Sequence, residues 1–445
     1  MSNGSITELI SKGELDKELT DINNNTSLFN YSITKKNKYS KAESRYYPKG
    51  KANWGNTVRF NLEKDGDLLY GLYLVVKLPK LSVSELNVNP IQDENDPSSI
   101  YRVRYTDFIG NVLVEKISLY INGQLIDEQY GDYMQYYTDL YISDWNRKEM
   151  IGMDDNLRKP NLKINSEIIY IPFKFWFCNQ TPLPVIALQY SDIYIDVKFR
   201  KFSECITILE YNNNNLYHST KIHNEVPLED VVLQANYYLT ELNERKELAM
   251  KDYEILITQC QLKSTNFNTT ANLEISFNHV VKDLMFLVQS NKHKVNGEYF
   301  NVSAKMDYPP AELNPLNKYQ LWDLEPQRHI LSRARIIFDG IERLEWRDAK
   351  YFYNMQNHEN YKNSLESYVY VYSFNINPTK DTNFSGCNFS RIDNPYLQVE
   401  VKPNNFILDT NLRYPTNDSY ELKCFATNFN ILVIKNGLAG LKYNN

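Results

Sequence analysis

The acidic residues near position 130 are the side chains best placed to carry out chemistry. Asp127, Glu128 and Asp132 form the densest acidic cluster and lie beside several tyrosines. A pair of carboxylates is the machinery of glycosidases, in which one group acts as acid and the other as base or nucleophile. The alternative is a solvated strand end that leads into a helix N-terminus, where acidic side chains are favoured. We favour this second interpretation.

The histidines and one short acidic motif are the candidate metal ligands. None of the six histidines belongs to an HExxH or HxH motif, and His218 and His223 are five residues apart in a polar segment, which does not fit one helical face. Asp65-Gly66-Asp67 resembles the start of a calcium loop, but no ladder of acidic ligands follows it. We therefore expect ordinary loop histidines and a hairpin turn at Gly66.

Motifs of other enzyme classes are also missing from the sequence. There is no GxxxxGK[ST], no GxGxxG after a strand and no GxSxG, and the five cysteines form no CxxC. An odd number of widely spaced cysteines is typical of buried free thiols in a reducing compartment. The sequence therefore predicts no catalytic residue, no cofactor-binding residue and no metal ligand.

Composition limits the class of protein further. The 445 residues include 15 Gly and 17 Pro, about 7% of the chain together, which excludes collagen-like and Pro/Gly-rich disordered proteins. The formal net charge of −6 argues against a general nucleic-acid binder. No basic and apolar leader begins the chain, and no apolar run approaches 18 residues. We expect a soluble protein made in the cytosol.

Short strands separated by turns and long loops dominate the rest of the sequence. Thirty-five tyrosines suit half-buried pleated surfaces, and two alternating runs flank each of the hairpin signals Asn122-Gly123 and Asp339-Gly340. Helices are expected only at 6–19, 131–143, 241–252 and 349–355. The expected strands are 58–63, 68–78, 112–121, 124–128, 167–177, 185–199, 231–240, 255–262, 280–289, 331–338, 341–346, 368–374, 396–401, 420–425 and 430–435.

A weak internal repeat divides the chain into two similar parts. SLYINGQLIDE (118–128) aligns with RIIFDGIERLE (335–345) at a separation of 217 residues, and SDIYIDVKF (191–199) resembles DNPYLQVEV (393–401). About eight strands in each part favour two tandem eight-stranded antiparallel jelly-roll sandwiches with short helices and long loops. We predict an N-terminal arm at 1–26, a first jelly roll at 27–242 and a second at 243–445.

The segment 31–59 carries eight basic residues and a single acidic one, Glu43. It is interpreted either as a solvated basic loop or as an arm that touches an anionic surface or a neighbouring subunit. The chain is expected to have two sandwiches, long loops and a terminal arm, and it has no catalytic motif. These features are typical of a structural subunit of a larger assembly.

Several long and specific motifs follow one another in order along nearly the whole chain. The most specific is IPFKFWFCNQTPLPVIALQYSDIYIDVKFR (171–200), followed by SGCNFSRIDNPYLQV (385–399). The others are LISKGELDKELT (9–20), KDGDLLYGLYLVVKLP (64–79), INGQLIDEQYGDY (121–133), LTELNERKELAMKDYEILITQ (239–259) and GLAGLKY (437–443).

Together these motifs resemble those of the major capsid proteins of nucleocytoplasmic large DNA viruses. This resemblance implies a double jelly roll, no active site and a homotrimeric, pseudo-hexagonal capsomer. Such capsomers would tile an icosahedral shell around an internal membrane and a double-stranded DNA genome. Implied partners are neighbouring capsomers, minor capsid proteins and the internal membrane on the N-terminal side, but no specific nucleic acid. The protein would be part of the virion and be assembled in the host cytoplasm. In that fold we expect strand residues Phe173, Phe175, Trp176, Phe177, Leu188 and Tyr190 to fill the first sandwich. Phe389, Ile392, Leu397 and Val399 would fill the second, and Asp393 and Asn394 would turn the chain.

Two other functions stay open from the sequence. One is a transient membrane-associated assembly scaffold of the same viral lineage. The other is a carbohydrate-active jelly-roll protein that uses Asp127, Glu128 and exposed tyrosines.

Overall fold

A computed structural model gives the three-dimensional structure of the chain. It describes residues 39–443 except 87–99, 142–145, 180, 213–214, 220–223, 296, 304–328, 362–364, 366, 380–384 and 403–418. The expected helix at 6–19 and the arm at 1–26 lie outside the described residues.

The first half of the molecule, strands β1 to β14, is built from two facing antiparallel sheets and two small additions. Sheet 1A has the order β1-β14-β3-β10, with β9 also paired to β3, and sheet 1B has the order β2-β11-β6-β7. The strands of sheet 1A are β1 (Tyr39–Tyr46), β3 (Leu68–Leu78), β9 (Glu167–Pro172), β10 (Leu183–Pro184) and β14 (Asp230–Thr240). Those of sheet 1B are β2 (Thr57–Leu62), β6 (Val114–Ile121), β7 (Gln124–Tyr130) and β11 (Ile193–Phe199). The additions are β5 (Tyr101–Tyr105), β12 (Ile206–Asn212) and β13 (Asn215–Ser219), and the pair β4 (Leu81–Ser82) and β8 (Lys163–Ile164).

The second half, strands β15 to β24, repeats this plan. Sheet 2A has the order β15-β23-β17-β20, with β21 paired to β17 and β24 to β23, and sheet 2B has the order β16-β22-β18-β19. The strands of sheet 2A are β15 (Tyr253–Phe267), β17 (Val280–Ser290), β20 (Tyr370–Ser373), β21 (Cys387–Asn388), β23 (Tyr420–Lys435) and β24 (Leu438–Leu441). Those of sheet 2B are β16 (Thr270–Glu274), β18 (Leu331–Phe338), β19 (Ile341–Asp348) and β22 (Tyr396–Val401).

The two strand orders correspond one to one. β1, β14, β3 and β9 occupy the places of β15, β23, β17 and β20, while β2, β11, β6 and β7 occupy those of β16, β22, β18 and β19. The expected all-β double jelly roll is therefore confirmed, and both segments of the sequence repeat fall on corresponding strands.

Short helices connect the strands. In the first half these are α3 (Ile109–Leu113), α4 (Gly131–Tyr141), α5 (Asn146–Met150), α6 (Asp155–Arg158), α7 (Trp176–Asn179), α8 (Phe202–Cys205) and the 3-10 helix η1 (Val185–Ala187). The connecting helix α9 (Leu242–Met250) leads into the second half, which holds α10 (Asn291–Val295), the π-helix η5 (Tyr351–Met355), α11 (Gln356–Asn360) and the 3-10 helix η6 (Phe389–Arg391). The expected helices near 131, 241 and 349 are confirmed.

Left-handed Asx-Gly pairs close three hairpins. Asn122 and Gly123 have φ values of 52° and 77°, and Asp339 and Gly340 have φ values of 51° and 78°. Positive φ at both central residues defines the type I′ turn, whose twist matches that of the flanking strands. Both predicted hairpins are confirmed, and Asn436 with Gly437 closes a third between β23 and β24.

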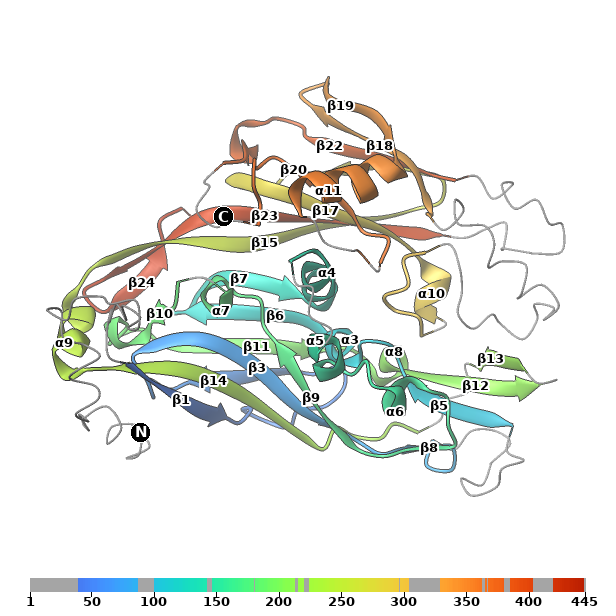
Figure 1. Ribbon diagram of the computed structural model, residues 1–445, viewed down its shortest axis with the longest axis horizontal. Helices are drawn as coiled ribbons and strands as arrows, with labels where there is room; N and C mark the ends of the chain where they lie inside the picture. Colours follow the sequence, from blue (N-terminus) through green and yellow to red (C-terminus); the bar gives the residue numbers. More distant parts are fainter. Residues whose placement is uncertain are drawn as a thin grey trace, which may run out of the picture.

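The four large sheets stack in the order 1A, 1B, 2A, 2B (Figure 1). One buried cluster fills the space between sheets 1A and 1B. It continues across the junction of the two halves to the outer face of sheet 2A, which is turned toward sheet 1B, and there it includes Met285, Leu287 and Phe425. A second cluster fills the space between 2A and 2B with residues such as Leu284, Phe286 and Val399. Neighbouring residues of β17 therefore point into different cores.

Some expected strands are wrong. The strand expected at 167–177 ends at Pro172, and Phe173 and Phe175 lie in a loop while Trp176 and Phe177 belong to α7. All four are nonetheless buried, because the loop and the short helix fold over β3. Similarly, Val185–Phe199 is not one strand, since η1 and a loop precede β11. Leu188 is buried as expected, but Tyr190 is 74% exposed.

In the second half, Leu397 and Val399 fill the core as strand residues, Phe389 does so from η6, and Ile392 is only half-buried. Asn394 has a φ of 53°, which confirms the turn.

Four other features also differ from expectation. Val112 and Leu113 belong to α3 rather than to β6, and the strands expected at 420–425 and 430–435 form the single strand β23. The basic segment is only partly a loop where it is described, since Tyr39–Tyr46 pairs with β14 along its whole length, whereas residues 47–56 form a loop that contains one isolated bridge. Asp65 and Gly66 do not close a hairpin, because β2 and β3 belong to different sheets.

Candidate functional site at the junction of the two halves

Helix α4 is the main element of the junction. It begins at Gly131, where a β-carbon would lie 2.1 Å from the carbonyl oxygen of Asn111 and 2.2 Å from that of Val114, so only glycine allows the chain to enter the helix here. The helix then lies against the outer face of sheet 2A. The ring of Phe425 on β23 packs between Tyr130 and Tyr133, with centroid distances of 6.1 and 5.9 Å.

A buried ionic cluster joins α4 to sheet 2A. Asp132 accepts a hydrogen bond of 2.5 Å from Lys423 Nζ and lies 3.6 Å from the Arg200 guanidinium. Burial acts to raise the pKa of Asp132, but the charges of Lys423 and Arg200 hold it below its ordinary value. Burial likewise opposes the charge of Lys423, yet the Asp132 carboxylate raises the pKa of that amine. The cluster therefore stays ionised in the folded protein.

The ionic cluster borders a cavity of about 620 Å³ between the halves. Arg200 also lies over the ring of Tyr299, with 4.1 Å to the centroid. The charged residues of the wall are Glu115, Asp132, Arg200, Glu204, Lys294, Glu421 and Lys423. Because both signs are present and several are already paired, this wall does not select a ligand of one charge.

Asp127 links two sheet edges. Its carboxylate accepts a 2.9 Å hydrogen bond from the backbone N–H of Cys260 on β15 and a 3.2 Å bond from Gln129 Nε2. Burial raises the pKa of Asp127 to about 8. Gln259 donates to the carbonyl oxygen of Ile126 beside it. These bonds satisfy polar groups at the edges of β7 and β15, so they hold sheet 1B to sheet 2A.

Asp283 is a third polar link across the junction. Tyr141 of α4 donates a 2.7 Å hydrogen bond to its carboxylate, and Tyr361 donates one of 3.1 Å. A few residues further on, Ser367 donates to Asp139. The junction thus combines aromatic packing with hydrogen bonds to buried carboxylates.

The candidate acidic cluster does not form a glycosidase pair. Asp127 bonds to β15 and Asp132 to Lys423, while Glu128 accepts hydrogen bonds from Lys116 Nζ (2.7 Å) and Ser118 Oγ (3.0 Å). Each carboxylate therefore has its own protein partners. Asp132 does begin a helix, as the favoured interpretation required, but Asp127 and Asp132 are buried rather than solvated. Apart from Gln129, which lies two residues from Asp127, their partners lie 68 to 291 residues away along the chain, so no local sequence signal could have identified those distant partners.

The other candidate ligands have structural roles where they are described. Asp67 accepts hydrogen bonds from Thr240 N (2.7 Å) and Thr240 Oγ1 (3.1 Å) and pairs with Arg245 at 3.0 Å. His223 lies outside the described residues, and His218 belongs to β13, where its side chain is not described. Among the described residues no group of three or more His, Cys, Asp or Glu side chains could hold a metal ion. The five cysteines are free thiols; Cys205, Cys260 and Cys424 are buried, and the other two are half-buried.

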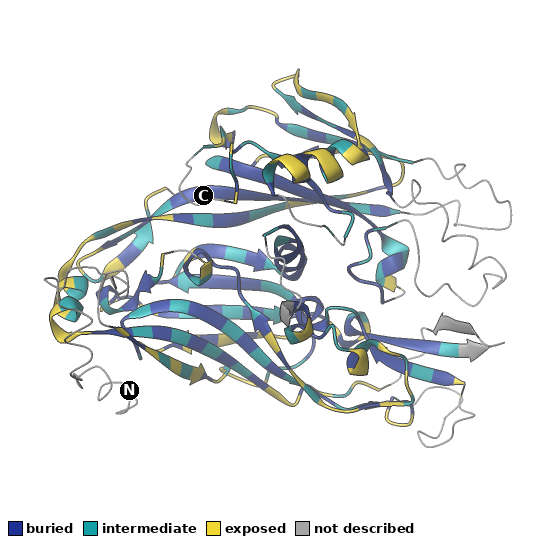
Figure 2. Cartoon of the chain, viewed as in Figure 1, coloured by how far each residue is buried: buried dark blue, intermediate teal, exposed yellow. Residues whose placement is uncertain are grey.

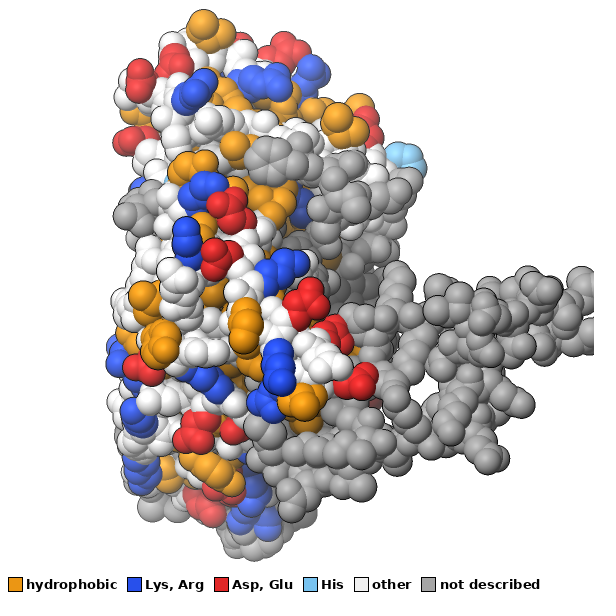
Figure 3. All heavy atoms as spheres, turned by 90° about the vertical axis from the view of Figure 1, so that its left-hand side faces the viewer, with side chains coloured by type: hydrophobic (Ala, Val, Ile, Leu, Met, Phe, Trp, Pro, Cys, Tyr) orange, Lys and Arg blue, Asp and Glu red, His pale blue; other side chains and the backbone are white. Residues whose placement is uncertain are grey.

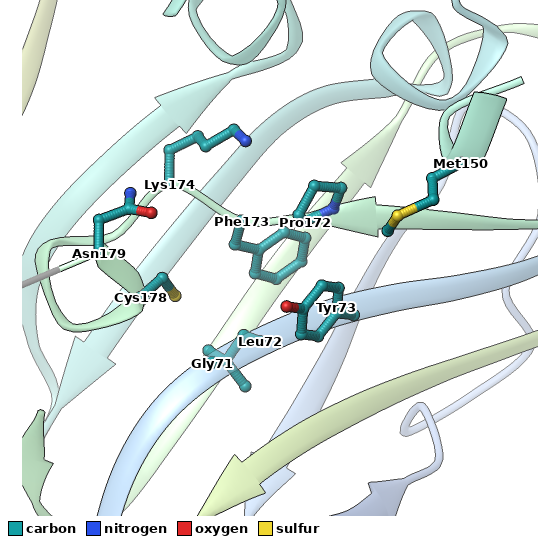
Figure 4. Close-up of a pocket in the computed structure, with 9 residues that line it drawn as sticks. All are labelled: Gly71, Leu72, Tyr73, Met150, Pro172, Phe173, Lys174, Cys178 and Asn179. Carbon is teal, nitrogen blue, oxygen red and sulfur yellow. The ribbon is translucent and has the colours of Figure 1, made fainter. Parts of the chain in front are cut away.

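A smaller pocket of about 150 Å³ lies beside β3 and α7. Figure 4 shows Cys178 and Asn179 of α7 on one side of it and Tyr73 and Met150 on the other, with Phe173 between them. Burial raises the pKa of Cys178 to about 12, so this thiol stays protonated and is a poor nucleophile. The pocket has no arrangement of groups suited to catalysis.

The end of the molecule where α9 joins the two halves mixes hydrophobic, basic and acidic side chains, with no large area of one sign (Figure 3). None of the residues of α9 is buried. In the described part of the chain, no helix has the length and apolar character needed to cross a membrane.

Two family models together match most of the chain. The model of the major capsid protein N-terminus matches residues 27–240, and that of the large eukaryotic DNA virus major capsid protein matches residues 244–440. The major capsid protein of Phaeocystis pouchetii virus is 22% identical, with 99% of this chain and 100% of the relative covered. That of Paramecium bursaria Chlorella virus 1 is 23% identical with the same coverage.

Solved structures show the same architecture. The crystal structure of PBCV-1 VP54, fitted into a reconstruction of the virophage Sputnik, has a TM-score of 0.74 at 22% identity and covers 94% of this chain and 100% of its own. The Faustovirus major capsid protein has a TM-score of 0.66 at 11% identity and covers 96% of this chain and 95% of its own. The fold is therefore that of the double jelly-roll capsid proteins.

The chain belongs to the major capsid proteins of the nucleocytoplasmic large DNA viruses. Proteins of this family are structural components of the virion, and contacts within a capsid are part of their role. The two relatives and the Faustovirus structure described above are named as major capsid proteins, which gives no support to the scaffold and carbohydrate-active alternatives.

Proposed function

We propose that three copies of this protein form a pseudo-hexagonal capsomer and that such capsomers tile an icosahedral shell. The observation that carries this proposal is the correspondence of the strand orders of sheets 1A and 1B with those of sheets 2A and 2B. Two similar sandwiches in a chain give six similar units when three chains form a ring. A subunit that joins the next through two different surfaces gives a closed ring when the rotation between neighbours closes, and most soluble oligomers have closed symmetry.

The proposal extends to partners, location and domains. The capsomers contact one another and minor capsid proteins, the N-terminal side faces an internal membrane, and no specific nucleic acid is bound. Assembly takes place in the host cytoplasm, and the protein acts without catalysis. We also propose an arm at 1–26 and domains at 27–242 and 243–445. The division between the two domains is supported by the absence, among the described strands, of a sheet that mixes strands of both halves.

Sedimentation of the purified protein, combined with negative-stain imaging, tests the proposal. We expect a particle of three times 52.4 kDa with a hexagonal outline. A stable monomer at micromolar concentration contradicts the proposal. Purified virions would test the location, since the protein is expected to be their most abundant component.

A further inference from the structure

The cavity between the two halves extends from buried residues to the surface. On its wall Asp132 and Lys423 are 4% and 6% exposed, whereas Val295, at the end of α10, is 66% exposed. Figure 2 shows α4 in dark blue and exposed residues at the end of α10. The volume of about 620 Å³ falls within the range of small-molecule sites. The cavity therefore has the size of a binding site and an opening to solvent.

Charged side chains of alternating sign line this cavity. In order they are Arg200, Asp132, Lys423, Glu421 and Lys294, and each forms an ion pair with the next. The first three of these contacts measure 3.6, 2.5 and 3.6 Å. Hydrogen-bond donors and acceptors therefore follow one another along the wall.

The wall as a whole is neutral. Besides this row it carries Glu115 and Glu204, and Glu115 is paired with Lys198 at 2.6 Å. The three cations of the row then balance its two carboxylates and that of Glu204. A ligand with a net charge would leave one charge uncompensated in a partly buried space, which costs free energy. The cavity is therefore suited to a neutral ligand with many polar groups.

Two polar atoms on the buried side of the wall have no hydrogen-bond partner among the described residues. They are Asp132 Oδ1, an acceptor, and Arg200 Nε, a donor. Buried polar atoms are almost always hydrogen-bonded, and a hydroxyl satisfies both kinds because it donates and accepts. Both atoms are covered, so a ligand reaches them after a small shift of the Arg200 side chain. At the accessible end of the row, the side chains of Lys294 and Glu421 are 26% and 17% exposed and can meet ligand hydroxyls directly.

Aromatic and apolar side chains complete the wall. They are Tyr130, Tyr299, Leu262 and Val295. Sites for small molecules combine such apolar surface with a few polar groups in fixed positions. A sugar ring matches this combination, because its hydroxyls donate and accept hydrogen bonds while its carbon-bound hydrogens pack against apolar and aromatic surface.

We propose that this cavity binds a neutral sugar, either free or at the end of a glycan chain. The inference concerns binding alone, since Asp132 stays ionised beside Lys423 and has no proton to give to a leaving group. It also differs from the carbohydrate-active interpretation of Asp127 and Glu128, neither of which lines this cavity. Every residue of the wall belongs to one chain, so the inference does not depend on the proposed trimer.

Saturation-transfer NMR on the purified protein tests the class of ligand. The probes are D-glucose, D-galactose and D-mannose at millimolar concentration, with anionic D-glucuronate and cationic D-glucosamine for comparison. We expect saturation transfer to at least one neutral sugar and weaker transfer to both charged sugars. The absence of transfer to all three neutral sugars overturns the proposal. Stronger transfer to a charged sugar overturns the assignment of a neutral ligand.

Blocking the cavity tests the location of the site. Val295→Trp and Ser203→Trp each place a large ring on an exposed part of the wall, so folding is expected to persist, as an unchanged circular dichroism spectrum would show. Each should weaken sugar binding about tenfold or more, because the ring occupies the space of the ligand. The control is Met250→Trp on α9, which is 83% exposed and does not line the cavity; it should bind as the wild type does. Wild-type affinity in both blocking variants overturns the assignment to this cavity.

A final comparison distinguishes the two sources of the sugar. The sugar that binds is offered free and as the non-reducing end of a trisaccharide. Equal binding of both supports recognition of a glycan chain, and binding of the free sugar alone supports recognition of a solute. A trisaccharide that binds the blocking variants as well as it binds the wild type contradicts the proposal. A wild-type protein that is monomeric but binds the sugar overturns only the trimer, so the two proposals fail separately.

Discussion

Strands β3 and β17 occupy corresponding places in the two halves but have different environments. Along β3 (LLYGLYLVVKL) buried residues alternate for the most part with half-buried ones, whereas in β17 (VVKDLMFLVQS) every residue after Val280 is buried. Sheet 1A has one face toward the core and one toward the surface, which produces alternation. Sheet 2A is covered by sheet 2B on one side and by α4 on the other.

The contrast shows how polar residues enter a sheet that is buried on both faces. Lys282, Asp283 and Gln289 of β17 are buried, and Asp283 accepts hydrogen bonds from two tyrosines. A buried polar group costs free energy unless it is paired, so each such residue requires a partner. For Asp283 one partner, Tyr141, comes from the opposite half, whereas Gln289 donates to the carbonyl oxygen of Tyr299 in its own half. The junction is therefore a polar and aromatic interface inside one chain, and the following predictions test it against the open face of sheet 1A.

The largest difference is expected between aromatic residues on the two outer faces. Phe425→Ala removes a ring packed against Tyr130 and Tyr133 and should lower the free energy of unfolding by about 3–5 kcal/mol. Tyr170→Ala on the open face of sheet 1A should cost about 1 kcal/mol or less in the monomeric subunit. Urea denaturation at concentrations that keep the subunit monomeric measures both. Equal losses would mean that the two faces are covered alike.

The buried ionic cluster should be nearly as sensitive. Asp132→Ala leaves the charges of Lys423 and Arg200 without their carboxylate in the junction and should cost about 3 kcal/mol. The matched control is Glu115→Ala, which breaks a partly exposed ion pair with Lys198 and should cost less than about 1 kcal/mol. The measurement is again the free energy of unfolding. A small loss for Asp132→Ala would show that water entering the cavity stabilises these cations.

Acid should destabilise the second half through His329. The pKa of this imidazole is lowered from 6.5 to about 4, mainly by burial and to a smaller extent by the nearby charges of Lys402 and Lys350. The neutral ring is thus favoured by folding, so its stabilisation is complete above pH 6.5 and is lost as the pH falls through 4. Because the ring is not fully removed from water, we expect an effect of about 1–2 kcal/mol.

Thermal unfolding between pH 7 and pH 4 tests this expectation. His329→Gln should lose less stability over this range than the wild type, while the exposed control His358→Gln should follow the wild type. If the unfolding temperatures of all three proteins fall equally with pH, His329 is not the source of the acid sensitivity.

The smallest and most equal effects are expected at the two corresponding hairpins. Gly123→Ala and Gly340→Ala each place a β-carbon at a φ near 78° with no atom within 4 Å, so only backbone strain of about 1 kcal/mol results. Gly437→Ala should cost more, since its β-carbon would lie 2.6 Å from the ring of Tyr190. Thermal unfolding of the three variants compares them directly. A clear inequality between the first two would indicate that the corresponding turns are not equivalent.

Sequence signals were reliable where the determinants are local. Leu68–Leu78 was predicted to the residue, and both Asx-Gly turns were found because few residues tolerate the left-handed region they require. The aromatic run at 173–177 was misread as a strand because apolar residues without clear periodicity fit a buried strand as well as a buried loop and helix. Asp65-Gly66 was misread because a turn motif does not reveal whether the next strand joins the same sheet. Tyr190 shows that residue type alone does not decide burial.

Strand patterns and turn residues were enough to predict the class of the fold and the repeat of two sandwiches, and the ordered motifs were enough to predict the viral family, because all of these signals are local in the sequence. The roles of Asp127, Asp132 and Asp283 in the junction became visible only in three dimensions, because the partners that link them to the other half lie on strands and a helix far away in sequence. The tertiary structure alone also distinguished the covered face of sheet 2A from the open face of sheet 1A. The physical reason is that burial depends on which surfaces meet, and two strands with similar local patterns can meet different neighbours.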